Sequence, residues 1–299
     1  MRTIPLILTL LISVSTVYAQ TDTTYWNTGG NIGINFNQST LSNWSAGGTS
    51  SVSGTGVMFL LADYAKSRVY WNNSLDLGYG LLKEEGQGTR KTEDKIVLVS
   101  NYGAQLSPQN DKWFFSALLD FRTQFTDGFS TDNPDSVISK FAAPAYLLTS
   151  IGLDYKPFSF LSFKFGLVSS KMTFVNDQTL ADRGAFGVDE GKMFRGEFGG
   201  TFAANFNKEI FENTTFTSNL VLFSNYVENP DKIDVNWENT LVMKINSFLT
   251  ANLYNQLIYD YDIKFDVTDE QGNVVQEERV QFKNILGLGI SYKFGGQRG

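Results

Sequence analysis

Hydrophobic and polar positions alternate along most of this chain with a period of two. In the segment from Leu286 to Phe294, large apolar side chains occupy every second position, and small or polar ones fill the positions between. Alternation of this kind predicts a β-strand with one apolar face and one polar face. The apolar set is Leu286, Leu288, Ile290, Tyr292 and Phe294.

The same pattern recurs along the chain and predicts about twelve strands, an even number as in single-chain bacterial outer-membrane barrels. Many of the segments are longer than the five or six residues of a typical globular strand. Lengths of about 9–11 residues suit tilted strands that cross a bilayer. The predicted strands are 31–37, 51–65, 69–83, 95–106, 112–125, 145–156, 161–175, 194–207, 214–227, 234–246, 248–262 and 280–294.

The connections between these segments alternate between short and long. Short ones such as "AKSR" and "SPQND" follow every second strand, and longer polar ones such as "KEEGQGTRKTED" and "NDQTLADRGAFGVDEGKM" follow the others. Short turns at one end and long loops at the other are typical of an outer-membrane barrel. We therefore expect residues 20–299 to form one all-β domain, a transmembrane antiparallel β-barrel of about twelve strands.

Residues 1–19 have the features of a secretory signal peptide. Arg2 gives a positive start, Ile4 to Val14 is a short apolar run, and Val17 to Ala19 form a small-x-small cleavage site. The sequence has no cysteine, which excludes a lipoprotein signal and disulfides. We expect export through the inner membrane and integral insertion in the outer membrane, with outer-membrane lipid and the barrel assembly machinery as partners.

Composition narrows the possible chemistry. The chain has no histidine, which excludes His-based triads and His metal sites, and a net charge of −7 argues against a nucleic-acid partner. No motif indicates a cofactor or a metal ion, and none indicates an enzymatic mechanism. We expect a non-enzymatic protein.

The segment from Tyr25 to Lys83 resembles an uncharacterised family of outer-membrane proteins from Bacteroidota, which is described only as a domain of unknown function. Its most distinctive part is the run "LSNW" followed by paired glycines, namely Leu41, Ser42, Asn43, Trp44, Gly47 and Gly48. The resemblance implies a location and a fold, and almost no chemistry. The connection that holds this run could fold into the lumen, dock a partner at the rim, or place Trp44 at the level of the lipid headgroups.

Charged residues on the polar sides of the strands are the candidate functional residues. They could fill the lumen as mutually paired side chains, or line a selective pore. The set is Asp76, Asp120, Arg122, Lys164, Arg195, Glu197, Glu238, Lys244, Asp260 and Asp262.

The segment "LGISYKF" resembles the recognition signal that outer-membrane barrels offer to their assembly machinery, and Tyr292 and Phe294 are its aromatic residues. Taken together, the pattern predicts a narrow pore or uptake channel. A structural subunit of an export or assembly complex, with an unidentified envelope partner, is the alternative. A lipid-modifying enzyme is a third possibility.

Overall fold

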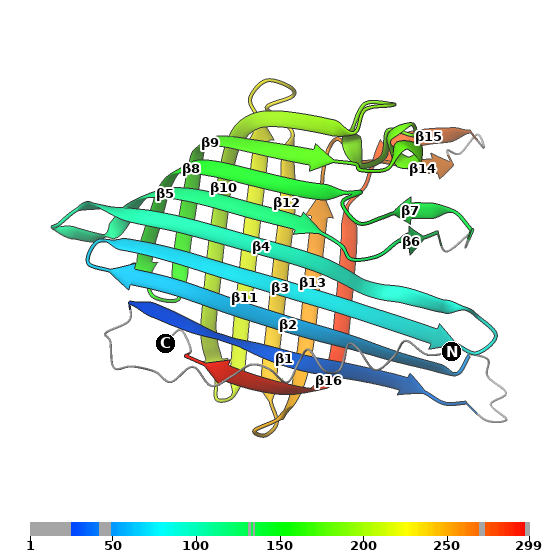
Figure 1. Ribbon diagram of the computed structural model, residues 1–299, viewed down its shortest axis with the longest axis horizontal. Helices are drawn as coiled ribbons and strands as arrows, with labels where there is room; N and C mark the ends of the chain where they lie inside the picture. The colour runs from blue at the N-terminus through cyan, green and yellow to red at the C-terminus, as the bar shows by residue number, and fades with distance from the viewer. Residues whose placement is uncertain (1–24, 42–48, 131–132, 134, 269–272, 297–299) are drawn as a thin grey trace, which may run out of the picture.

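Twelve antiparallel strands close into a barrel in this computed structural model (Figure 1). The structure describes residues 25–41, 49–130, 133, 135–268 and 273–296. The barrel strands are β1 (Trp26–Ser39), β2 (Ser51–Lys66), β3 (Val69–Glu84), β4 (Thr89–Ser107), β5 (Asn110–Thr123), β8 (Ala145–Phe158), β9 (Leu161–Phe174), β10 (Phe194–Phe211), β11 (Thr214–Asn225), β12 (Ile233–Lys244), β13 (Leu249–Tyr259) and β16 (Gln281–Gly295). The predicted fold class is therefore confirmed. The predicted signal peptide lies outside the described residues.

Strands that follow one another along the chain are neighbours in the wall, and β1 pairs with β16 to close it. In Figure 1, β1 to β5 cross the front of the barrel, and β10 to β13 lie behind them. Two-residue turns join β2 to β3 and β4 to β5 at one end. We call this the turn end, and the opposite end the loop end.

The long loops carry small elements of their own. Residues between β5 and β8 form the hairpin β6 (Gly128–Phe129) and β7 (Val137–Ser139), and residues between β13 and β16 form β14 (Lys264–Thr268) and β15 (Val274–Glu278). The β9–β10 loop contains the short helices α1 (Gln178–Ala181) and η1 (Ala185–Gly187). The sequence pattern missed these elements because each is too short to show a period.

Several predicted boundaries differ from the structure: β1 begins at Trp26 and not at residue 31, and β10 extends to Phe211 and not to residue 207. Two further differences have clear local reasons. Residues 89–94, assigned to a loop, belong to β4, because Leu81 to Lys83 of β3 continue to pair with Lys91 to Thr89 beyond a β-bulge. The strand predicted to reach Asp262 ends at Tyr259, because Asp260 starts a turn. Its carboxylate accepts a hydrogen bond from the Asp262 backbone N–H at 3.0 Å, and its carbonyl accepts one from Ile263.

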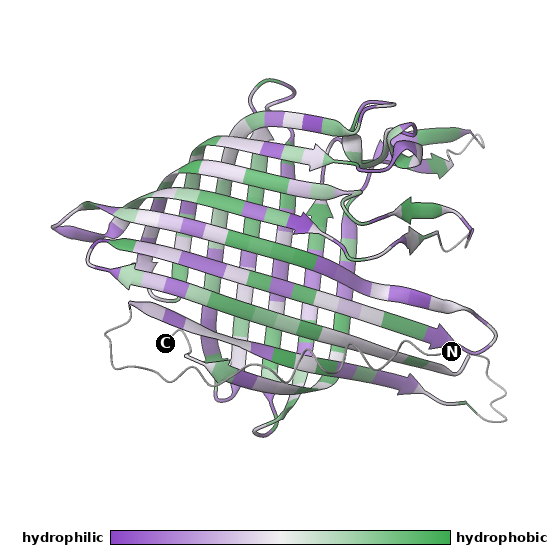
Figure 2. Ribbon diagram, in the orientation of Figure 1, coloured by the Kyte–Doolittle hydropathy of each residue, from purple (hydrophilic) through white to green (hydrophobic). Residues whose placement is uncertain are grey.

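The hydropathy of the wall is inverted relative to a water-soluble protein. Large apolar side chains lie on the outside, where Leu286 is 63% exposed and Leu288 is 59% exposed. Figure 2 shows apolar and polar residues alternating along each strand. The clustered buried apolar residues of the described chain lie in the loops instead, around Ala143, Val175 and Leu180. No helix among the described residues is long and apolar enough to cross a membrane.

Candidate functional site in the barrel lumen

The polar faces of the strands converge on the lumen, and the structure places the predicted charged residues there. Eight of them lie on barrel strands, in the positions between the exposed apolar residues. Asp260 and Asp262 lie in the turn after β13 and reach basic side chains of β9 and β10. The eight are Asp76, Asp120, Arg122, Lys164, Arg195, Glu197, Glu238 and Lys244.

Arg122 makes an ion pair that crosses the barrel. It holds Asp120 of its own strand through two hydrogen bonds of 2.8 and 2.9 Å, and its Nη1 lies 2.7 Å from Oε1 of Glu238. Arg122 belongs to β5 and Glu238 to β12, and four strands separate them around the wall. Because the contact cannot follow the wall, it spans the lumen and narrows it.

A second crossing joins β16 to β4, where Lys283 Nζ lies 2.7 Å from Oε2 of Glu93. Beside it, Lys95 pairs with Asp76 of the adjacent strand at 2.6 Å. The ring of Tyr254 lies beneath both ammonium groups, at 5.6 Å from Lys95 and 5.9 Å from Lys283. Together with Arg122 and its partners, these residues form a constriction, which comprises Asp76, Glu93, Lys95, Asp120, Arg122, Glu238 and Lys283.

A more acidic cluster lies toward the loop end. Lys171 of β9 contacts Asp234 and Asp260, each at 2.6 Å, and Glu197 at 3.6 Å. Arg195 contacts Asp262 at 2.6 Å and Glu197 at 3.6 Å. Four inward carboxylates, besides the exposed Glu228 at 3.8 Å from Arg195, thus share two cations, which leaves an excess of negative charge. We call this the mouth cluster, which comprises Lys171, Arg195, Glu197, Asp234, Asp260 and Asp262.

The β9–β10 loop folds over the mouth cluster. The carbonyl of Gly187 accepts a hydrogen bond of 2.9 Å from Arg195. The loop is itself anchored by Asp177, which caps α1 through the Leu180 N–H and pairs with Lys140 at 2.6 Å. The hydrogen bond from Lys140 and those from the helix N-terminus lower the pKa of the Asp177 carboxyl. These contacts fix the loop against the lumen entrance.

A buried carboxylate lies on the wall toward the turn end. Asp154 of β8 is 0% exposed and accepts hydrogen bonds from the Tyr70 hydroxyl, from Ser116 at 2.8 Å and from Asn101 at 3.2 Å. Lys164 pairs with it at 2.5 Å. These donors come from β3, β5, β4 and β9, so the carboxylate ties adjacent strands together.

Glycine and lysine residues complete this end of the lumen. Gly103 lies directly against Tyr70, since a Cβ at Gly103 would sit 2.2 Å from the tyrosine ring. The Lys156 ammonium lies 3.2 Å from the centre of the same ring. Lys244 and Lys293 also occupy inward positions near the turn end. The lumen is therefore acidic at the loop end and basic at the turn end.

Several of these residues were not predicted from the sequence. The alternation could have identified some of them as inward-facing. Each lies an even number of positions from other inward residues of its own strand, and these are Asp154, Asp234 and Lys283. Lys171 could not be found in this way, because a β-bulge at Leu167 shifts the parity of β9 between Lys164 and Lys171. Glu93 was missed for a different reason: residues 89–94 were assigned to a loop, although Glu93 faces inward like Lys95 and the bulge lies on its N-terminal side, at Thr92.

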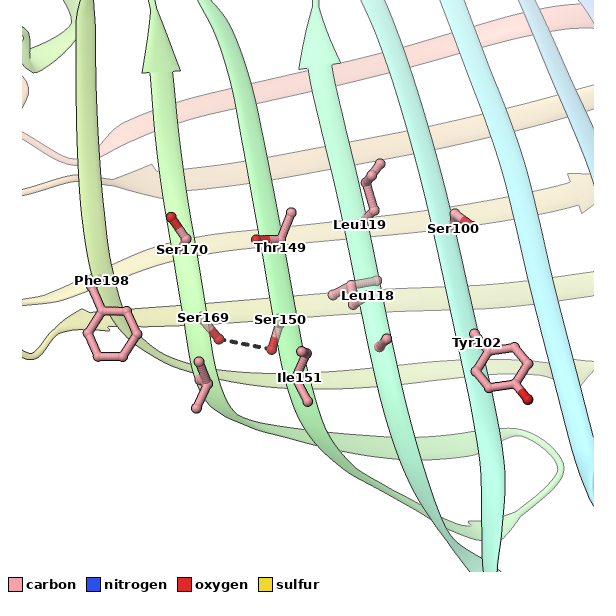
Figure 3. A pocket seen from close by; sticks show the side chains of 12 residues that line it. Ser100, Tyr102, Leu118, Leu119, Thr149, Ser150, Ile151, Ser169, Ser170 and Phe198 are labelled. Atoms are coloured by element: carbon pink, nitrogen blue, oxygen red, sulfur yellow. Dashed lines mark hydrogen bonds between the residues drawn. The ribbon is translucent and has the colours of Figure 1, made fainter.

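The outside of the wall has a shallow groove of about 420 Å³ across β4, β5, β8, β9 and β10 (Figure 3). Tyr102, Leu119 and Phe198 border it, and the hydroxyls of Thr149 and Ser170 lie on its floor. Ser150 and Ser169, which hydrogen-bond to each other at 2.8 Å, point to the opposite side of the wall. This groove faces away from the lumen.

The remaining predicted residues fall into two groups. Leu41 is tied to Ser50 by a hydrogen bond of 3.1 Å from its backbone N–H, whereas Ser42, Asn43, Trp44, Gly47 and Gly48 lie outside the described residues. Tyr292 and Phe294 are 68% and 40% exposed, and their rings stack on the outside of β16. The described residues contain no cluster of acidic side chains suited to a metal ion.

Comparison with solved structures finds distant barrels. An outer-membrane channel from Pseudomonas putida F1 has a TM-score of 0.40 at 12% identity, covering 94% of this chain and all of the other. The NanC porin has a TM-score of 0.38 at 12% identity, covering 89% and 100% of the two chains. The translocator domain of the autotransporter NalP from Neisseria meningitidis has a TM-score of 0.35 at 9% identity, with coverages of 92% and 90%. The barrel itself is established by the strand pairing.

Comparison of the sequence gives one family and no characterised relative. No curated protein matches the chain. Residues 36–129 match the model of a family described as a protein of unknown function, DUF3078. The match supports membership of an uncharacterised family, and it brings no activity with it.

Proposed function

We propose that this protein is a non-enzymatic channel of the outer membrane, with a narrow lumen that admits small solutes and prefers cations. Its exposed apolar outside fits lipid, and its polar inside fits water. The resemblance to the Bacteroidota family is part of this proposal. So is delivery of the chain by a signal peptide and by the barrel assembly machinery.

The observation that carries the proposal is the set of ion pairs across a twelve-stranded barrel. Barrel diameter grows with strand number, and about eight strands give an interior that side chains alone can fill. A barrel of twelve strands is wider, so the crossing from Arg122 to Glu238 narrows the lumen without occupying its whole cross-section. Ion pairs between long side chains can separate and so let a solute pass, whereas a lumen packed with hydrophobic side chains would stay closed.

The mouth cluster supports the preference for cations. Rings of carboxylates select cations in channels, and a narrow, low-dielectric entrance strengthens their field. Here Glu197, Asp234, Asp260 and Asp262 outnumber Lys171 and Arg195 at the loop end. A cation arriving from the loop side therefore meets a favourable potential before it reaches the constriction.

Planar-bilayer recording tests the proposal. The wild-type protein should give small conductance steps, with a reversal potential in a KCl gradient that shows preference for K⁺. The double variant Arg122→Gln/Glu238→Gln removes the crossing pair and should increase the step several-fold. The matched control is Glu277→Gln/Arg279→Gln, which removes an exposed ion pair of 2.8 Å at the end of β15 and should leave the step unchanged.

The same recording separates the alternative functions. If neither the wild type nor the double variant conducts, the channel proposal is wrong, and the crossing pairs serve to stiffen a structural subunit. If both conduct without ion preference, the channel stands and the role of the mouth cluster is wrong.

A further inference from the structure

A row of asparagine side chains crosses the outside of the wall. Asn239 of β12 lies opposite Asn255 of β13 in the strand register, and Asn255 lies opposite Asn284 of β16. Ser218 of β11 extends the row on its other side. Four neighbouring strands therefore place polar groups side by side, and we call this set the asparagine row.

The asparagine row faces outward and lies within the apolar belt. Along β12 it falls between Trp237 and Leu241, and along β13 between Leu253 and Leu257, all of which occupy outward positions. Asn239 and Asn255 are close to the middle of strands that span Ile233–Lys244 and Leu249–Tyr259. In a membrane these amides meet acyl chains, which offer no hydrogen bonds.

The chain satisfies only part of the row's hydrogen-bonding capacity. Asn284 donates to Asn255 at 2.5 Å, and Trp237 donates to Ser218 at 2.9 Å. The Oδ1 atom of Asn239 has no partner among the described residues but is buried, so the capacity open to a neighbouring molecule belongs to the other amide groups of the row. Each asparagine side chain carries two donors and an acceptor with two lone pairs, so most of the capacity of the row is unused.

Outward polar residues on the opposite wall behave differently. Trp71 donates to Ser100 at 2.8 Å, Ser100 donates to Asn73 at 2.8 Å, and Asn73 donates to the carbonyl of Ala62 at 3.0 Å. This chain of bonds is closed within the wall. Unlike this closed set, the asparagine row keeps unused donors and acceptors on the outside of the wall.

We propose that the asparagine row is the contact between two copies of this chain in the membrane. An amide is both donor and acceptor, so a row of amides is complementary to its own copy related by a two-fold axis. Hydrogen bonds between polar side chains hold membrane segments together where hydrophobic attraction between them is absent. The flanking apolar residues supply packing above and below the row.

Position within the row predicts which residue meets its own counterpart. In a two-fold contact, the residues nearest the axis contact themselves. Asn255 is the middle asparagine of the three, so its two copies should be adjacent. The proposal rests on the membrane location above and is independent of whether the lumen conducts.

Cysteine cross-linking in lipid vesicles tests it, because the chain has no cysteine of its own. Asn255→Cys should form a disulfide-linked dimer several-fold more than Leu119→Cys. Leu119 is the matched control: it faces outward on β5, which lies diametrically opposite β13 in the strand order. A second variant, Asn255→Leu, should insert normally and run as a monomer in native mass spectrometry, whereas the wild type runs as a dimer.

Each outcome bears on the proposal. Equal cross-linking at the two positions would show random collision and overturn it, as would a wild-type monomer. Cross-linking of Asn255→Cys to a different protein in native membranes would overturn the assignment to a second copy. Failure of both cysteine variants to insert would instead count against the membrane location, and so against the function proposed above.

Discussion

The two faces of β16 meet opposite surroundings. Leu288 and Ile290 are more than half exposed on the outside, whereas Gly289, between them, is buried. On the inside, Lys283 reaches across the lumen to a carboxylate of β4. The difference shows that the wall separates two solvents. Successive side chains of a strand point to opposite faces, so a residue meets lipid or lumen according to its place in this alternation.

Charge placed on the outer face should give the largest difference between the faces. Leu288→Arg puts a guanidinium into the apolar belt, which costs about 2–4 kcal/mol near the bilayer midplane. Ser291→Arg, on the inner face of the same strand, should cost much less because water and carboxylates are within reach. Urea titration of the barrels refolded in lipid measures both, and equal losses of stability would mean that the assigned faces are wrong.

Removal of the buried carboxylate should give the next largest effect. Asp154→Ala leaves Tyr70, Ser116 and Lys164 without their common acceptor, and we expect a loss of about 2–3 kcal/mol, in line with hydrogen bonds to charged groups. The matched change is Asp266→Ala, in the β14–β15 hairpin, which removes one exposed hydrogen bond with Gln276 and should cost little. The same urea titration compares them. Similar midpoints would show that the inner wall does not depend on the Asp154 contacts.

The aromatic residue near the end of β16 should affect delivery more than stability. Phe294→Ala removes part of a side chain at the rim, which corresponds to about 1 kcal/mol of lost burial. We expect several-fold less protein in the outer membrane of cells, with nearly normal refolding of purified protein in detergent. Phe282→Ala, an outward aromatic at the other end of β16, is the control and should be delivered normally. Normal surface abundance of Phe294→Ala would rule out the proposed assembly signal.

The smallest expected effect is a pH dependence at the loop that covers the mouth. Because Lys140 and the helix N-terminus lower the pKa of Asp177 in the folded loop, the contact contributes stability above the unfolded pKa of about 3.9. This contribution is lost as the pH falls through the lower folded value. Proteolysis of the β9–β10 loop should therefore increase at acidic pH in the wild type. In Asp177→Asn it should be faster at neutral pH and change less with acidification; an unchanged profile would contradict the anchoring role.

Much of the wall could be predicted from the sequence because its signal is local. Each of the twelve predicted strands overlaps a barrel strand, and the outward set of β16 was read directly from Leu286 to Phe294. The pattern holds because lipid and water impose opposite requirements on alternate residues. The hairpins and short helices of the loops are stabilised by neighbours that a single segment does not reveal.

The arrangement of the lumen could be predicted only in part. The alternation of apolar and polar residues predicted that Arg122 and Glu238 face inward. Their pairing, however, depends on which strands face each other across the closed barrel. Strand number and stagger together determine that geometry. Bulges add a further difficulty, because one extra residue in β9 moved Lys171 to the opposite parity from that expected. The asparagine row was missed because it depends on the register of four neighbouring strands at once.

The most direct test of the two-solvent account uses neighbouring residues of one strand. Nitroxide labels at Ile290→Cys and Ser291→Cys, in the otherwise cysteine-free chain, report collisions with oxygen, which concentrates in lipid, and with a water-soluble nickel chelate. The account predicts that the label at 290 collides mainly with oxygen and the label at 291 mainly with the chelate. If both labels report the same phase, the wall does not separate lipid from an aqueous lumen.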